Sequence, residues 1–265
     1  MCLFSLGKFI PILTHLVPKL FFRILKIMIA SVLVIRYRKI FIPFAFFAMA
    51  FFRLPMLYNK KISFYKLMGS GKNGSFDAVP DLQQWAIFYV HDQNVEGKNT
   101  TEHISTVLGK FIKKYLSVFN CETFLLHLAP MMVHGTWDNK KPLEQDKELV
   151  TREGPIAVLT RASIKLGKAK YFWKNVAPAT KSMLAAEGFV FSLGIGEVPW
   201  LKQATLSVWQ SEVLMKKFAY GSKTHSEIIK KTRAEKWYSE DMFARFHILS
   251  AQGSIKGINP LETKL

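Results

Sequence analysis

The sequence of 265 residues predicts an α+β protein made of two similar halves, and three observations support this. Residues 134–143 and 252–261 share a glycine at their second position and a Pro-Leu pair at their end. An aromatic-rich run enters a Gly-x-Gly step at residues 64–71 and again at 189–196. Strand-like and helix-like runs also follow one order in both halves. Such a repeat indicates one supersecondary unit used twice, with each copy burying a face that neither could bury alone.

The first half is expected to run strand, helix, strand, strand, helix, strand. Its opening strand is apolar and β-branched, its first helix is rich in aromatic residues, and its second helix carries an apolar stripe. The expected elements are strand 30–37, helix 43–58, strand 63–72, strand 84–91, helix 100–119 and strand 122–137. This order is the split βαβ, or ferredoxin-like, unit.

The second half repeats the order after a polar linker. The expected elements are strand 156–164, helix 169–187, strand 189–196, strand 205–210, helices 213–220 and 225–237, and strand 242–249. Two fused ferredoxin-like repeats can close their uncovered sheet faces into an α+β barrel of the dimeric type, with room for an apolar ligand between sheets and helices. The alternative is two independent ferredoxin-like domains.

These elements divide the chain into four parts. Residues 1–27 are expected to be an apolar, basic N-terminal extension, or else to result from a start codon assigned too early. Residues 28–143 are expected to be the first repeat, 144–154 the linker and 155–265 the second repeat.

The formal net charge is +18, and its distribution favours a membrane surface over nucleic acid. Residues 1–76 contain no Asp or Glu, and their Lys and Arg are interspersed with Phe, Leu, Ile and Met. Such a surface suits an anionic membrane interface, although an ordinary solvated basic face is the alternative. The longest apolar run, residues 40–52, falls short of the roughly 18–20 residues that span a bilayer. We therefore expect a cytoplasmic protein that is peripheral on the inner face of the membrane.

Common catalytic motifs give little support to other enzyme classes. Residues 69–74 fit G-x-G-x-x-G, but they lead into loop-forming residues instead of opening a helix, so a nucleotide site is not expected. H-E-x-x-H, C-x-x-C, Walker A and G-x-S-x-G patterns do not occur. The two cysteines, Cys2 and Cys121, are too few for a disulfide framework or a metal cluster.

Seven histidines are the remaining candidates for metal or acid-base chemistry, and their scatter along the sequence does not indicate a multi-histidine site. His225 is the most suggestive, because Thr224 and Glu227 form a capping box that starts a helix there. The positive end of a helix dipole keeps an imidazole neutral, as a metal ligand must be. The alternative is an exposed histidine with no role.

The other histidines rank lower. In a regular strand 242–249, His247 shares a face with Phe243 and Arg245, and we expect that face to be solvated. His127 stands among leucines, where a buried histidine with its hydrogen bonds satisfied is the commoner outcome. His134 is expected to belong to a turn.

Several ordered segments resemble the spheroidene monooxygenase family of carotenoid ketolases. They are residues 64–71, 159–164, 194–199 and 203–246, and the similarity covers about residues 28–262. The resemblance implies a haem (iron) monooxygenase that introduces oxo groups into a long acyclic carotenoid. It also implies dioxygen as oxidant and a ferredoxin-type electron donor. The 22 Phe residues suit an apolar groove for such a substrate.

The resemblance also implies roles for two residues. Haem enzymes on dimeric α+β barrels commonly take their axial histidine from a helix of the C-terminal half, which favours His225. Arg161 is expected to contact a haem propionate or bound oxygen, or equally to be a surface charge. We expect the porphyrin and the carotenoid to bind in the apolar interior between the two repeats. Departures from the family pattern are the 1–27 extension, Tyr238 in place of Phe, and Ile255 in place of Trp.

Two other functions compete with a monooxygenase. The first is a non-catalytic binder of haem or a long apolar ligand on the same barrel. The second is an RNA-binding module, because ferredoxin-like sheets also bind RNA, but the aromatic consensus of such sheets is missing. No nucleic-acid partner is therefore expected.

Overall fold

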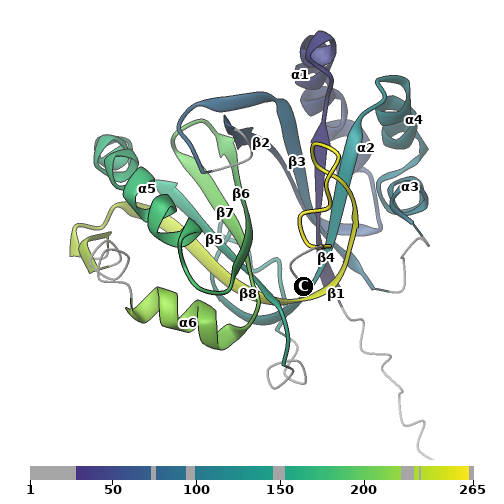
Figure 1. Ribbon diagram of the computed structural model, residues 1–265. Helices are drawn as coiled ribbons and strands as arrows, with labels where there is room; N and C mark the ends of the chain where they lie inside the picture. The colour runs from purple at the N-terminus through teal and green to yellow at the C-terminus, as the bar shows by residue number, and fades with distance from the viewer. Residues whose placement is uncertain are drawn as a thin grey trace, which may run out of the picture.

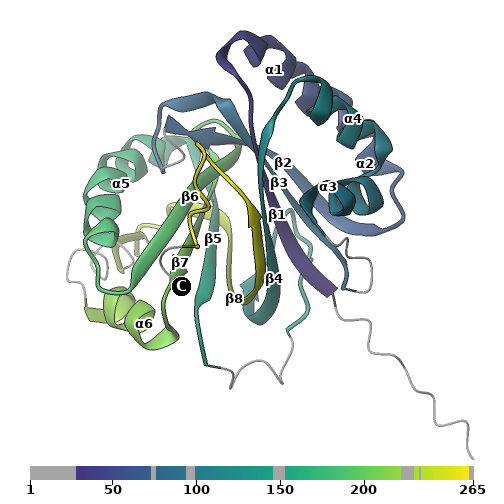
Figure 2. The same cartoon turned by 45° about the vertical axis from the view of Figure 1, so that its right-hand side comes forward.

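The computed structural model describes residues 28–72, 76–93, 99–145, 153–221, 230–232 and 234–262. These residues form a closed barrel of eight antiparallel strands with helices on its outside (Figure 1). The predicted α+β class is confirmed. Figure 2 shows α1–α4 on one side of the barrel and α5 and α6 on the other.

The first half contributes four strands and a set of short helices. The strands are β1 (Met28–Arg36), β2 (Ile62–Gly71), β3 (Pro80–Asp92) and β4 (Glu122–Gly135). The helical segments are η1 (Lys39–Phe41), α1 (Ile42–Phe51), α2 (Arg53–Leu57), α3 (Thr100–His103), the π-helical turn η3 (Ile104–Leu108) and α4 (Lys110–Val118).

The second half contributes the other four strands. They are β5 (Ile156–Ile164), β6 (Phe189–Val198), β7 (Lys202–Trp209) and β8 (Tyr238–Gly253). The helical segments described here are η5 (Leu166–Lys168), α5 (Ala169–Leu184) and α6 (Glu212–Gly221). Most of the linker expected at 144–154 and the first five residues of the helix expected at 225–237 lie outside the described residues.

The strand order around the barrel is β1-β3-β2-β6-β7-β5-β8-β4. The halves meet at two seams: β4 pairs with β8 over most of its length, whereas β2 and β6 share a short ladder at Gly69 and Ser70. Inward side chains from all eight strands pack into one apolar core, which also takes in Trp137, Leu143 and Leu261. The expectation of a ligand inside the barrel is therefore wrong, because side chains fill that space.

Two further apolar layers lie outside the barrel. In the first half, Leu33, Ile87 and Leu125 pack against α1, α2, η3 and α4. In the second half a smaller cluster joins Val158 and Trp209 to α6. Because strand side chains alternate between faces, each strand serves the interior and one of these layers at the same time.

The expected helix 100–119 is broken into three pieces. The π-helical turn η3 ends at Gly109, whose φ of 105° and ψ of 157° lie outside the helical region. Glycine reaches such a positive φ without the steric cost that other residues carry. α4 then starts afresh, with Ile112 and Leu116 buried one turn apart on its inward face.

The segment Lys39–Leu57 is long and apolar enough, by length and composition, to cross a membrane. This corrects the expectation that no run reaches that length, because the helical run continues past Arg53. Its inward residues Ala45, Ala48 and Phe52 nevertheless pack on the barrel. Its other face is exposed.

Matching turns follow β4 and β8. Gly135 and Gly253 adopt φ values of 82° and 84°, and a Cβ at either position would lie within 2.2 Å of a backbone carbonyl oxygen. A carboxylate of the opposite half holds each turn. Glu240 accepts hydrogen bonds from the residues after Gly135, and Glu122 accepts them from the residues after Gly253. Each half thus stabilises the turn of the other.

Candidate functional site

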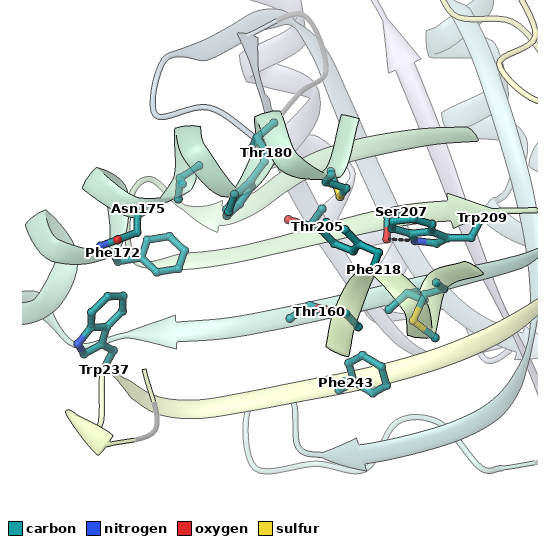
Figure 3. Close-up of a pocket in the computed structure, with 17 residues that line it drawn as sticks. Thr160, Phe172, Asn175, Thr180, Thr205, Ser207, Trp209, Phe218, Trp237 and Phe243 are labelled. Carbon is teal, nitrogen blue, oxygen red and sulfur yellow. Dashed lines mark hydrogen bonds between the residues drawn. The ribbon is translucent and has the colours of Figure 1, made fainter. Parts of the chain in front are cut away.

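A pocket lies on the outer face of the second-half sheet, beneath α5 and α6, with a cavity volume of about 200 Å³. In Figure 3, Thr160, Thr205 and Phe243 come from the strands, and Asn175 and Thr180 come from α5. The lining is mainly apolar and aromatic. Its members are Phe76, Val158, Thr160, Phe172, Asn175, Val176, Ala179, Thr180, Met183, Thr205, Ser207, Trp209, Met215, Phe218, Ala219, Trp237 and Phe243.

The pocket leaves part of the sheet uncovered. β5 pairs with β7 and β8, so Thr160 lies in the middle of the sheet, yet its side chain is exposed. On β7 the indole Nε1 of Trp209 donates a hydrogen bond to Ser207 Oγ at 3.0 Å, which satisfies the buried indole (Figure 3). A few hydroxyls in an aromatic lining are typical of a small-molecule site.

A second hollow adjoins the pocket along α5. It has a cavity volume of about 670 Å³ and shares Phe76, Val176 and Thr180 with the pocket. Trp173, Ala177 and Leu184 also line it. Ligand sites commonly measure ~300–1,000 Å³. The pocket alone falls below that range, whereas the two hollows together reach it.

His225 lies outside the described residues, so the structure does not place it. Along the chain it stands between Ala219 and Trp237, both of which line the pocket. Among the described lining residues, none is a His, Cys or Tyr; Met183 and Met215 carry the only sulfur atoms. The lining thus offers apolar and aromatic surface to a flat apolar group, and any histidine ligand to an iron in such a group would have to come from outside the described lining.

Arg161 does not line the pocket. It follows Thr160 on β5, so its side chain takes the opposite face of the strand, and its cross-strand neighbours Ala204 and Met242 belong to the barrel core. Its side chain is only 1% exposed, which rules out a surface charge. The structure thus places Arg161 at one end of the barrel interior and outside the lining of the pocket.

Carboxylates surround the Arg161 guanidinium. It forms an ion pair with Glu240, and its Nη2 lies 3.5 Å from Asp138 Oδ1 and 3.7 Å from Glu197 Oε1. The centroid of the Trp137 ring is 5.6 Å from its Cζ. Arg161 and its carboxylate partners thus form a charged layer at one end of the barrel, next to the apolar core.

Two lysines complete this ion network. Lys66 pairs with both Asp138 and Glu197, and Lys202 lies 2.9 Å from Asp138. Burial raises the pKa of Glu240, but hydrogen bonds from Asn139, Thr136 and Arg161 outweigh it and lower that pKa to about 2. Glu240 is therefore ionised at neutral pH beside the Arg161 guanidinium, which suits a structural role for this ion pair.

The face of β8 that was expected to be solvated is partly buried. Phe243 lines the pocket, and Arg245 forms an ion pair with Glu212 of α6. His247 is 4% exposed. The prediction of a solvated face is wrong because α6 packs over this part of β8, and its Glu212 carboxylate neutralises Arg245.

Three relatives match most of the chain. A spheroidene monooxygenase of Rhodobacter capsulatus is 32% identical over 225 residues, which cover 84% of this chain and 91% of that protein. That of Cereibacter sphaeroides is 35% identical over 79% of this chain and 63% of that protein. The Rubrivivax gelatinosus protein is 31% identical, over 77% of this chain and 75% of that protein. The chain belongs to the spheroidene monooxygenase family.

Solved structures show that this member of the family shares its fold with more distant proteins. An aldoxime dehydratase in complex with butyraldoxime superimposes with a TM-score of 0.56 at 9% identity, over 88% of this chain and 84% of that one. A second aldoxime dehydratase gives a TM-score of 0.54 at 10% identity, over 88% and 87%. No family model matches the chain.

The structure of this spheroidene monooxygenase family member also contains a histidine cluster that the sequence did not indicate. His91, His103 and His127 are all buried, and one ring nitrogen from each lies within 4.8 Å of the others. Ser31 Oγ is 2.8 Å from His91 Nε2 and 2.7 Å from His127 Nδ1. The histidines are far apart in sequence, but β4, β1 and β3 are adjacent in the sheet.

Burial and mutual proximity keep these rings neutral. Burial, with smaller contributions from His127 and His91, lowers the pKa of His103 to about 3. Burial and His91 lower the pKa of His127 to about 4, and burial lowers that of His91. His127 is a buried, hydrogen-bonded histidine as predicted, but the expectation of no multi-histidine site is wrong. The strand order β4-β1-β3 brings His91 and His127 together, and the position of α3 on the sheet adds His103.

Proposed function

We propose that this chain is a haem-dependent monooxygenase that introduces oxo groups into a carotenoid, and that its reaction takes place at the pocket beneath α5 and α6. The observation that carries this proposal is the aromatic hollow over an uncovered part of the sheet. The family relationship supports the reaction and the substrate class, because the relatives are named spheroidene monooxygenases.

The described residues suit haem in the following way. Phe172, Trp209 and Phe243 offer aromatic surface to a flat macrocycle, while the hydroxyls of Thr160 and Thr205 can orient polar groups. His225, on the chain segment that joins two pocket-lining regions, is proposed as the residue that would hold the haem iron. When bound, haem supplies the activation of dioxygen. The protein residues hold the group and keep water away from it.

A carotenoid is a rigid apolar rod, so its binding site must be long and apolar. The neighbouring hollow along α5, with Trp173, Ala177 and Leu184, extends the pocket in the way such a substrate requires. Dioxygen and a ferredoxin-type electron donor are proposed as the other reactants. The net charge of +18 would attract an acidic donor.

The barrel itself is proposed to be two fused ferredoxin-like repeats that reproduce the dimeric type in one chain. The same element order in both halves supports this, as do the strand orders β4-β1-β3-β2 and β8-β5-β7-β6. The matched turns at Gly135 and Gly253, each held by a glutamate of the other half, add further support.

A peripheral contact with the inner face of the membrane is proposed for α1 and α2. These helices and the preceding turn η1 expose a set of large apolar side chains beside basic residues, and the exposed set is Ile40, Phe44, Phe46, Phe47, Phe51, Leu54 and Leu57. The basic residues Lys39 and Arg53 stand in the same segment. Apolar area flanked by positive charge is the chemistry that binds an anionic lipid interface. A carotenoid that resides in lipid would then be close to its enzyme.

Replacing His225 with alanine is expected to leave the protein folded but without haem, because the iron loses its axial nitrogen. The measurement is the Soret absorption of purified protein, with its shift on reduction and addition of carbon monoxide. His134→Ala is the control, since that histidine is exposed at the end of β4. Full haem content in His225→Ala would transfer the axial role to another residue. A wild-type protein without haem would favour a non-catalytic binder.

The double substitution Phe47→Asp with Leu54→Asp is expected to weaken binding to phosphatidylglycerol vesicles at least about tenfold, because two large apolar contacts are lost. Vesicle co-sedimentation measures this. Val213→Asp is the control, since Val213 is 74% exposed on α6 in the other half. Equal binding by the double variant and the wild type would place the membrane contact elsewhere.

A further inference from the structure

We propose that His91, His103 and His127 form a binding site for a divalent transition-metal ion of the zinc class, separate from the haem pocket. The site lies in the first half, on the outer face of β1, β3 and β4, where α3 crosses the sheet. The pocket proposed for haem is in the second half, so the two sites share no described residue.

The ring positions are close to those that a metal needs. The ring centroids of His103 and His127 are 4.5 Å apart, and those of His91 and His103 are 5.1 Å apart. Bonds of ~2.0–2.1 Å to zinc in tetrahedral geometry place ligand nitrogens about 3.4 Å from one another. The nitrogens of this cluster, all within 4.8 Å, therefore need only a modest contraction.

The element most able to make that contraction is α3. His91 and His127 are fixed by strand pairing, whereas His103 ends the four-residue helix α3. The π-helical turn η3 follows directly. Such turns are rare and occur frequently at functional sites, because they place a side chain where a regular helix cannot.

Hydrogen bonds set the tautomers of the two strand histidines. His91 Nδ1 lies 2.9 Å from the carbonyl oxygen of Asp92, which can only accept, so His91 carries its proton there. Its Nε2 then accepts from Ser31 Oγ, and Ser31 Oγ in turn accepts from His127 Nδ1–H. His127 Nε2 is then unprotonated and carries a lone pair, and it accepts no hydrogen bond from the described residues.

His91 thus has the arrangement that is usual for a metal ligand. Histidines that bind metals nearly always donate the second ring N–H to a carbonyl or carboxylate, which fixes the ring and raises its basicity. Asp92 provides that acceptor. Ser31 Oγ, within hydrogen-bond distance of two of the three rings, marks the side from which a fourth ligand or water would come.

His103 gives the strongest indication that a partner is missing. It is fully buried, its Nε2 is 2.7 Å from the hydroxyl of Tyr89, and its Nδ1 has no hydrogen-bond partner among the described residues. A buried polar atom without a partner is uncommon in native proteins and calls for an explanation. A metal ion bound by the three rings would satisfy this nitrogen, or would take Nε2 in place of Tyr89.

The ligand set selects the class of metal. Three neutral imidazoles suit zinc, copper, nickel or iron, and they are unsuited to magnesium or calcium, which prefer oxygen ligands. Because the site is buried beneath α3, an ion there would hold that helix to the barrel. We therefore assign it a stabilising role in the first half.

The test uses full-length protein freed of metal with a chelator and then titrated with ZnCl₂. Wild-type protein is expected to bind one zinc ion per chain and to melt at a higher temperature when loaded. His103→Gln keeps an amide near Tyr89 but removes a ligand, and it is expected to bind zinc at least about 100-fold more weakly. His247→Gln, at a buried histidine of the other half, is the matched control and is expected to bind as the wild type does.

Cobalt substitution gives a second readout that is independent of haem. Co²⁺ in the three-histidine site is expected to produce visible d–d absorption in the wild type, and this absorption should be absent in His103→Gln. If that variant does not fold, His91→Gln takes its place in both measurements. Wild-type protein that binds no zinc stoichiometrically would overturn the proposal. A folded His103→Gln protein that binds zinc as tightly as the wild type would do the same.

Discussion

Replacing Thr160 with phenylalanine is expected to abolish carotenoid oxygenation while leaving the barrel folded. Thr160 is exposed in the middle of the second-half sheet because the pocket lies above it. A phenyl ring there would occupy much of a cavity of about 200 Å³ without displacing a packed neighbour. The measurement is pigment analysis of a carotenoid-producing host that expresses the variant, together with circular dichroism of the purified protein.

Val213→Phe is the matched control for this substitution. It adds the same ring in the same half, but Val213 is 74% exposed on α6 and does not line the pocket. Its carotenoid products are expected to equal those of the wild type. A Thr160→Phe protein that is folded and fully active would show that the reaction takes place away from this pocket.

Replacing Arg161 with methionine is expected to lower the free energy of unfolding by about 3 kcal/mol. Removing one partner of a buried ion pair typically costs ~3–5 kcal/mol, because the other charge stays buried without compensation. We expect the lower end, since the Glu240 side chain keeps 16% exposure and hydrogen bonds from Thr136 and Asn139. Urea unfolding at neutral pH measures the change.

Lys168→Met serves as the control for that experiment. Lys168 lies 3.4 Å from Glu235, and both side chains are about one-third exposed, at 35% and 37%. Exposed pairs of this kind contribute ~0–1 kcal/mol, so the loss should be small. If the two substitutions lowered the free energy of unfolding equally, the buried ion pair would contribute no more than an exposed one. Retained stability in Arg161→Met would contradict the structural role of the ion network.

The secondary structure was largely predictable from local patterns. Strand 156–164 was placed correctly to the residue, and the other strands and α5 agree within a few residues. Hydrophobic periodicity and turn residues carry this information locally. The break at Gly109 was missed, because an apolar stripe continues across it and only the backbone conformation shows the interruption.

The site was predictable only in part, because it depends on contacts between distant segments. The alternation of side chains along a strand predicts which residues share a face. It does not predict which helix or sheet covers that face. From the sequence, Arg161 suits a haem contact and a surface charge equally well, and the structure places it among carboxylates of three other segments. The histidine cluster depends on distant contacts in the same way, since strand order brings His91 and His127 together and the packing of α3 on the sheet adds His103.

A crystal structure of the haem-loaded protein tests the central claim most directly. We expect porphyrin density on the outer face of the second-half sheet, between Thr160 and α5, with His225 bound to the iron. Density for haem in the first half, or at the end of the barrel beside Arg161, would contradict the assignment of the reaction to this pocket.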